Sequence, residues 1–64
     1  MLVNGEQIRL QKTMTLEQYL LENGYDKTKV AIERNGEIVP KRMYTECMLT
    51  DADTLEIVHF VGGG

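Results

Sequence analysis

The chain has 64 residues, with 7 basic and 10 acidic side chains and a net charge of −3 at neutral pH. A chain this short folds as one domain and buries only about 60% of the surface that its unfolded form exposes, which excludes a deep enclosed pocket. The acidic balance argues against a nucleic-acid partner and favours a protein whose docking face is basic or neutral.

The sequence starts at Met1 without a signal peptide or an apolar run of membrane length, so we expect a cytoplasmic protein with no membrane partner. Cys47 is the single cysteine, and no internal disulfide can form. Free cysteine usually packs as a small hydrophobe, which leaves a chemical role for Cys47 as the lesser alternative.

The first ten residues predict a β-hairpin. The Asn-Gly pair at positions 4–5 favours a type I′ turn, because both turn residues need a positive φ. The apolar residues alternate on either side of it, so Met1 and Val3 share one face, as do Ile8 and Leu10.

A helix is predicted over residues 16–23. Thr15 is a good N-cap, Gln18 completes a capping box, and Gly24 suits the left-handed position after the helix. The residues spaced as one helical face are Leu16, Tyr19, Leu20 and Asn23.

A second hairpin is predicted around the Asn-Gly pair at positions 35–36. Val30 and Ile32 alternate before the turn, and Ile38 with Val39 forms a short run after it. Pro40 closes this run and makes it an edge or a strand end, because proline cannot donate to a ladder.

Residues 41–50 are predicted to be irregular, with four side chains on the core: Met43, Tyr44, Met48 and Leu49. Lys41-Arg42 is expected in a solvated loop, and contact with a partner is the alternative. After a turn at positions 50–53, residues 54–60 form the most strand-like run and the natural central strand. Leu55 and Ile57 would face the helix. The residues expected on the opposite face are Glu56, Val58 and Phe60.

Two hairpins, one helix and a final strand predict a two-layer α+β domain, with about five short strands packed on one main helix. We place this domain at residues 1–60 and a flexible glycine tail at residues 61–64.

Few residues within the chain suit catalysis or metal binding, so we expect no metal and no cofactor. One histidine, His59, and one cysteine are too few for the common zinc sites. Asp51 and Asp53 lack the glycine and glutamate of a calcium loop. His59 alternates with Leu55 and Ile57, which favours a structural role.

The tail offers a different reactive group, the carboxylate of Gly64. A carboxylate becomes an acyl donor once a leaving group such as AMP is attached to it. Gly62 and Gly63 have no side chain, and three extended residues reach about 10 Å, so they suit a narrow channel in a partner enzyme. The alternative is a frayed terminus or an expression remnant.

The chain resembles the ThiS family of sulfur carrier proteins in thiamine biosynthesis, and more distantly ubiquitin-like β-grasp proteins. The resemblance rests on "VNGE", "ERNGEIVP" and "DADTLEIVHFVGGG" and covers all 64 residues. It implies a β-grasp fold. It also implies that the protein is a cosubstrate and not an enzyme.

In that family, the residue matched by Gly64 is adenylated by a ThiF-like ATP-dependent enzyme and converted to a thiocarboxylate. The sulfur, which comes from a donor such as a cysteine desulfurase, passes to a ThiG-like thiazole synthase. Ala52 departs from the family, whose members commonly have glycine there, and this puts the turn type in doubt.

Val58 and Phe60 form an exposed apolar pair beside the tail, which we interpret as a docking patch. The alternative is that Phe60 packs on its own domain. Two other functions stay open: a carrier for molybdopterin or another sulfur product, and a ubiquitin-like binding module whose tail is inert.

Overall fold

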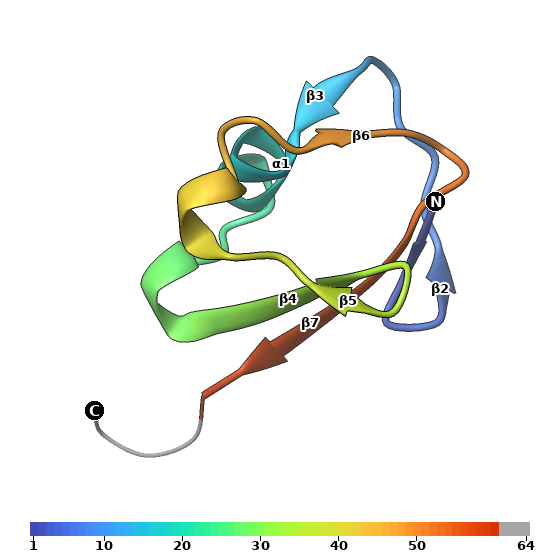
Figure 1. Cartoon of the computed structure of the whole chain (residues 1–64). Helices are drawn as coiled ribbons and strands as arrows, with labels where there is room; N and C mark the ends of the chain where they lie inside the picture. Colours follow the sequence, from blue (N-terminus) through green and yellow to red (C-terminus); the bar gives the residue numbers. More distant parts are fainter. Residues whose placement is uncertain (61–64) are drawn as a thin grey trace.

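The computed structural model describes residues 1–60 of the chain. A five-stranded sheet packs one face against a single α-helix, α1 (Leu16–Glu22), as Figure 1 shows. The strand order is β2 (Glu6–Gln7), β1 (Leu2–Val3), β7 (Thr54–His59), β4 (Val30–Arg34) and β5 (Glu37–Ile38). The predicted two-layer α+β fold and the central place of the last strand are confirmed.

The central strand β7 gives the sheet its mixed character. It runs parallel to β1, pairing Leu55 with Val3, and antiparallel to β4, pairing Ile57 with Ile32. The first and last thirds of the chain therefore lie side by side. The short strands β2 and β5 form the two edges, and the edge position of β5 is the one that Pro40 predicts.

Both Asn-Gly turns have the predicted backbone conformation. Asn4 and Gly5 have φ values of 51° and 82°, and Asn35 and Gly36 have values of 53° and 86°. Positive φ at both positions defines the type I′ turn, whose twist matches that of the strands it joins. These turns set the registers of β1 with β2 and of β4 with β5.

The helix begins where the sequence predicts. The Thr15 hydroxyl accepts from the Gln18 backbone N–H at 3.1 Å, and the Gln18 side-chain oxygen accepts from the Thr15 N–H at 3.0 Å, which completes the capping box. The helix ends at Glu22, one residue earlier than predicted. Asn23 is the exposed C-cap and not part of the buried helical face, and Gly24 follows with a φ of 77°.

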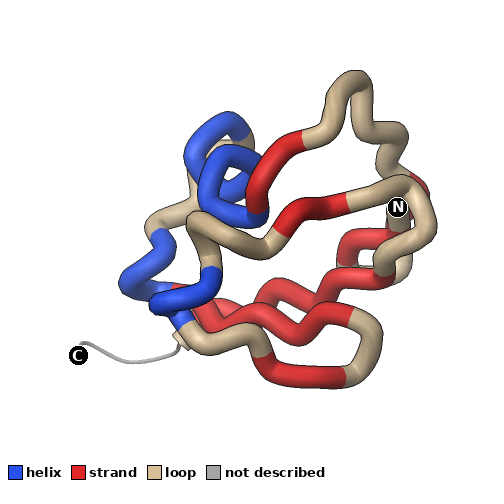
Figure 2. Tube along the Cα trace, turned by 45° about the horizontal axis from the view of Figure 1, so that its top comes forward, coloured by secondary structure: helices blue, strands red, loops and turns tan. Residues whose placement is uncertain are grey.

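A second, two-stranded sheet was not predicted. The strand β3 (Met14–Thr15) pairs antiparallel with β6 (Met48–Leu49). Of the two, β6 lies in the segment 41–50, which is predicted to be irregular. Figure 2 shows this pair beside the helix and apart from the larger sheet. Two short 3₁₀ helices complete the fold, η1 (Lys27–Lys29) and η2 (Lys41–Met43).

Half of the core assignments for residues 41–50 are wrong. Tyr44 and Leu49 are buried, but Met43 and Met48 are 39% and 46% exposed. Met48 and Leu49 are neighbours on a strand, and successive side chains on a strand point to opposite faces. Only one of the two can therefore reach the core.

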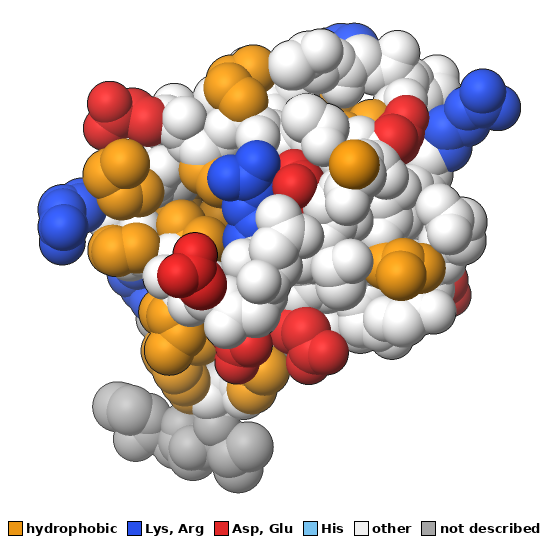
Figure 3. All heavy atoms as spheres, turned by 45° about the vertical axis from the view of Figure 1, so that its right-hand side comes forward, with side chains coloured by type: hydrophobic (Ala, Val, Ile, Leu, Met, Phe, Trp, Pro, Cys, Tyr) orange, Lys and Arg blue, Asp and Glu red, His pale blue; other side chains and the backbone are white. Residues whose placement is uncertain are grey.

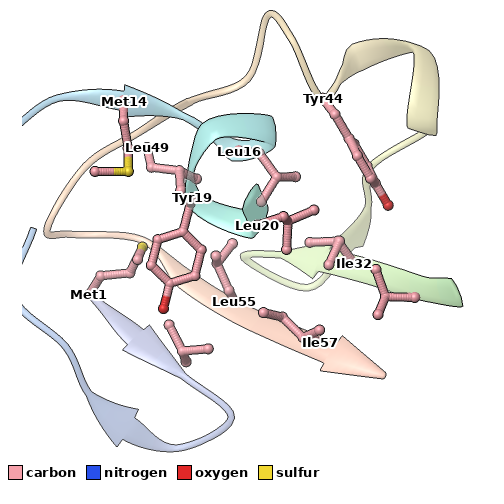
Figure 4. Packing of buried hydrophobic residues seen from close by; sticks show 12 residues of the cluster. Met1, Met14, Leu16, Tyr19, Leu20, Ile32, Tyr44, Leu49, Leu55 and Ile57 are labelled. Carbon is pink, nitrogen blue, oxygen red and sulfur yellow. The ribbon is translucent and has the colours of Figure 1, made fainter. Parts of the chain in front are cut away.

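The core lies between the helix and the large sheet, where the labelled side chains of Figure 4 converge. The helix contributes Leu16, Tyr19 and Leu20, and β7 contributes Leu55 and Ile57. Its other members are Met1, Val3, Met14, Val30, Ile32, Tyr44 and Leu49. Ile8 and Leu10 are both half-buried against it, although β2 ends before them at Gln7.

Candidate functional site

The candidate site is the carboxyl end of β7, from which residues 61–64 continue. His59 pairs with Val30, and Val58 pairs with Ala31. The strand ends at His59, one residue before the predicted end, but the Phe60 N–H still donates to the Lys29 carbonyl at 3.0 Å. The backbone is therefore fixed by the sheet as far as Phe60.

Gly62, Gly63 and Gly64 are the residues to which the sequence assigns the chemistry. They lie outside the described residues, and their assignments stay predictions. What the structure adds is the set of side chains around the last described residue.

Lys41 is the first of these side chains. Its Nζ donates to the Val30 carbonyl at 3.0 Å and lies 5.3 Å from the centroid of the Phe60 ring and 6.0 Å from that of Tyr44. Lys41 is exposed, as predicted, but it lies in η2 and not in a loop, and its ammonium contacts the sheet and two aromatic rings. An ammonium over aromatic faces is attracted by the ring quadrupoles, so Lys41 links η2 to both β4 and Phe60.

His59 has the structural role that the sequence favours. Its ring stacks on Tyr25, with 5.6 Å between the centroids and 30° between the planes. The stack joins the end of β7 to the segment that follows the helix. Although His59 alternates with Leu55 and Ile57, it is exposed, unlike its register partner Val30, which is buried in the core.

One face of β7 is buried and the other is exposed, as predicted. Leu55 and Ile57 are 0% and 5% exposed on the side of the helix, whereas Val58 is 53% exposed on the other side. Phe60 is 57% exposed at the end of the strand, with Lys41 beside its ring. Figure 3 shows hydrophobic side chains gathered on one side of the molecule, with acidic side chains bordering them.

A buried carboxylate fixes the turn that precedes β7. The side chain of Asp53 accepts from the Thr50 N–H at 2.9 Å, from Asn35 Nδ2 at 3.0 Å and from Arg34 Nη2 at 3.2 Å. Burial alone would raise the pKa of Asp53, but these three hydrogen bonds outweigh it and lower the pKa below its usual value. The network joins the turn between β4 and β5 to the turn before β7.

The contacts of Asp53 with Asn35 and Arg34 were missed because these residues lie 18 and 19 positions away from it in the sequence. The turn before β7 also has a backbone conformation that suits alanine at position 52, where family members commonly have glycine. Ala52 is not among the non-glycine residues of positive φ within residues 1–60, so alanine fits there without strain.

Within residues 1–60, no group of three or more His, Cys, Asp or Glu side chains gathers as a metal-binding cluster. Asp51 instead accepts from the Leu10 N–H at 2.9 Å.

Cys47 is a free, half-buried thiol packed against the core. No helix within the same range is long and apolar enough to cross a membrane.

Comparison with known proteins identifies the family of this chain. The sequence matches the model of the ThiS family over residues 1–64. The chain belongs to the ThiS family. It is 43% identical to the sulfur carrier protein ThiS of Bacillus subtilis, over 97% of this chain and 96% of that protein.

Two further proteins are similar to this ThiS-family chain: one is much longer, and the other is a solved structure of lower sequence identity. A thiazole synthase of Paramagnetospirillum magneticum is 50% identical over all 64 residues, but the chain spans only 20% of that protein. The crystal structure of the thiamine biosynthesis protein ThiS from Geobacter metallireducens superposes with a TM-score of 0.83. It is 24% identical and is covered over 96% of its length, which confirms the ubiquitin-like β-grasp fold.

Proposed function

We propose that this protein is a sulfur carrier of thiamine biosynthesis, a cosubstrate on which partner enzymes act. The observation that carries the proposal is the end-to-end match with the Bacillus subtilis sulfur carrier protein ThiS. The structure supports it in one further respect. The backbone is held by the hydrogen bond to Lys29 as far as Phe60, the last described residue before the segment that contains the glycine residues.

The chemistry that we propose takes place at Gly64. A ThiF-like enzyme binds ATP, and a carboxylate oxygen of Gly64 attacks the α-phosphate and releases pyrophosphate. The terminal sulfur of a persulfide, supplied by a donor such as a cysteine desulfurase, then displaces AMP and forms an acyl disulfide. A second thiol, such as free cysteine, attacks the outer sulfur of this disulfide, releases the thiocarboxylate and is itself oxidised to a disulfide. The net change in the carrier is the exchange of one carboxylate oxygen for sulfur.

The folded part and the tail have different roles in this proposal, recognition by the partner enzymes and reaction in their active sites. Residues 1–60 are the domain that the partners recognise, with Val58 and Phe60 in the docking patch. Gly62 and Gly63 enter the active site of the activating enzyme, where a Cβ would obstruct a narrow channel. The proposal takes Gly64 as the carboxyl terminus of the working protein.

The proposed acceptor of the sulfur is thiazole synthase. This assignment is supported by the Paramagnetospirillum magneticum thiazole synthase, about a fifth of which is the part similar to this chain. A carrier and the enzyme that it serves must meet, and joining the two in one chain raises their effective concentration.

The test is the intact mass of the protein after incubation with a ThiF-like enzyme, ATP, cysteine and a cysteine desulfurase. We expect an increase of about 16 mass units, from the exchange of oxygen for sulfur at one carboxylate. The Bacillus subtilis ThiS protein, treated in parallel, is the positive control. An unchanged mass for this protein, under conditions that convert the control, would refute the proposal.

A further inference from the structure

The end of β7 is held by one short segment, residues 24–29, which follows the helix. The ring of Tyr25 stacks on that of His59, and the Lys29 carbonyl accepts from the Phe60 N–H at 3.0 Å. This hydrogen bond lies beyond the strand, since β7 ends at His59. The last two described residues are therefore fastened to one segment, the first through its side chain and the second through its backbone.

The end of the helix fixes the position of Tyr25. The Tyr25 N–H donates to the Leu20 carbonyl at 2.9 Å. The Gly24 N–H donates to the Leu21 carbonyl at 3.3 Å, and the two bonds together form a Schellman motif with Gly24 in its left-handed position. Tyr25 is also half-buried and packs against the core. The ring that stacks on β7 therefore has a support that is built on the helix.

Local structure fixes the Lys29 carbonyl as well. The Asp26 side chain caps η1 by accepting from the Thr28 N–H at 2.9 Å and from the Thr28 hydroxyl at 2.6 Å. The Lys29 N–H donates to the Asp26 carbonyl at 2.9 Å. η1 leads directly into β4, whose first residue, Val30, pairs with His59. The segment thus presents two contacts of fixed geometry to the end of β7.

The stack acts on the last residue pair of the sheet. His59 is exposed, so its ring adds little to the core. The end pair of a strand opens more readily than an inner pair, because fewer contacts hold it. A side-chain contact at this place therefore acts on the direction in which the chain leaves the sheet.

We propose that Tyr25 and His59 are positioning residues, whose stacked rings set the direction in which the tail leaves the domain. This inference rests on the proposed function. Four extended residues beyond Phe60 span at most about 14 Å, so a change of direction of about 30° at this point displaces the Gly64 carboxylate by up to about 7 Å. A displacement of this size separates the carboxylate from the α-phosphate that it attacks.

The two rings act on the reaction and not on recognition. His59 lies on the opposite side of β7 from Val58, which belongs to the docking patch, because their side chains alternate along the strand. A carrier without the stack docks as the wild type does, but brings Gly64 to the ATP in fewer of the complexes. Loss of the stack therefore lowers kcat and leaves the KM for the carrier unchanged.

The test is a double-mutant cycle on pyrophosphate release by a ThiF-like enzyme. Tyr25→Leu and His59→Leu each remove one ring, and each should lower kcat about tenfold at an unchanged KM for the carrier. The double variant should lose no more than either single variant, because the stack is already absent in both. Tyr25→Phe keeps the ring and should retain the wild-type kcat.

Hydrogen exchange supplies a readout that does not depend on the enzyme. In Tyr25→Leu the Phe60 amide should exchange several-fold faster relative to the Ile57 amide, which donates to the Asn4 side chain at 2.8 Å. Val39→Ala truncates another side chain that is partly buried against the core. It controls for a general loss of stability and should keep the wild-type kcat and the wild-type ratio of exchange rates.

Losses of kcat that multiply in the double variant would show that the two residues act separately, and would overturn this inference. An unchanged exchange ratio in Tyr25→Leu would overturn it too, as would a rise in KM in place of the fall in kcat. In each of these cases the wild type is still converted, and the proposed function stands. Failure of the wild type to release pyrophosphate, under conditions that activate the Bacillus subtilis ThiS protein, would instead refute the proposed function and this inference with it.

Discussion

Lys41 and Phe60 are joined by a cation–π contact, with Nζ 5.3 Å from the centroid of the ring. The same ammonium donates to the Val30 carbonyl at 3.0 Å, so its position is fixed by the backbone of β4. Phe60 is the last described residue before the glycine run. We infer that Lys41 orients the point from which the tail leaves the domain.

Replacement of Lys41 by methionine should impair activation of the tail more than it impairs folding. Lys41→Met keeps most of the aliphatic stem but removes the hydrogen bond and the cation, at a cost of about 1 kcal/mol in unfolding free energy. We expect the KM at the activating enzyme to rise several-fold, because Phe60 is no longer held in one position. Steady-state kinetics and chemical denaturation measure the two effects.

Two variants control this prediction. Lys41→Arg keeps a cation that stacks on aromatic rings and should restore most of the wild-type KM. Arg42→Met removes an exposed neighbouring charge and should leave the KM unchanged. If Arg42→Met and Lys41→Met had the same effect, net charge and not the contact with Phe60 would be responsible.

The docking patch predicts that Val58→Ala and Phe60→Ala weaken recognition without unfolding the protein. Both side chains are more than half exposed, so their truncation should change the unfolding free energy by less than about 1 kcal/mol. An aromatic anchor at an interface is worth more, and we expect Phe60→Ala to raise the KM about tenfold. Leu21→Ala is the matched control, since Leu21 is 71% exposed on the helix. Equal KM values for all three variants would show that Val58 and Phe60 do not form a docking patch.

Deletion of Gly64 should abolish the gain in mass and leave stability unaltered. The proposed acyl donor is the carboxylate of Gly64, and a chain that ends at Gly63 presents its carboxylate about 3.5 Å too early. Addition of one residue after Gly64 should have the same effect for the opposite reason. Intact mass and thermal unfolding of both variants are the measurements. A large decrease in unfolding temperature would mean that the tail stabilises the fold.

The elements that the sequence predicts well are those determined by neighbouring residues. The two Asn-Gly turns depend on backbone preferences at two positions each, and the helix start depends on Thr15 and Gln18, three residues apart. The alternation of Leu55 and Ile57 is local as well. In these cases the physical cause lies within a few residues, where a single sequence displays it.

The features that the sequence did not predict depend on contacts between distant segments. The strand β6 is two residues long and is defined by its pairing with β3, which precedes it by more than thirty residues. Lys41 reaches Phe60 only because η2 packs near the end of β7, and Asp53 reaches Arg34 and Asn35 only across the sheet. No local pattern indicates such pairs, since loop closure brings them together only in the folded state.

Asp53 should make the stability of the fold sensitive to acid. Its pKa is lower in the folded state than in the unfolded chain, so its stabilising effect is complete above the unfolded pKa of about 3.9 and is lost as the pH falls through the folded value. Asp53→Asn should therefore cost about 2 kcal/mol at pH 7, because Arg34 and the Thr50 N–H lose a charged acceptor. The difference from the wild type should shrink towards zero as the pH falls below the folded pKa. Urea denaturation across this pH range measures it, with Glu37→Gln on the exposed edge strand as the control. A difference that stays constant with pH would show that the loss comes from packing and not from the ionised carboxylate.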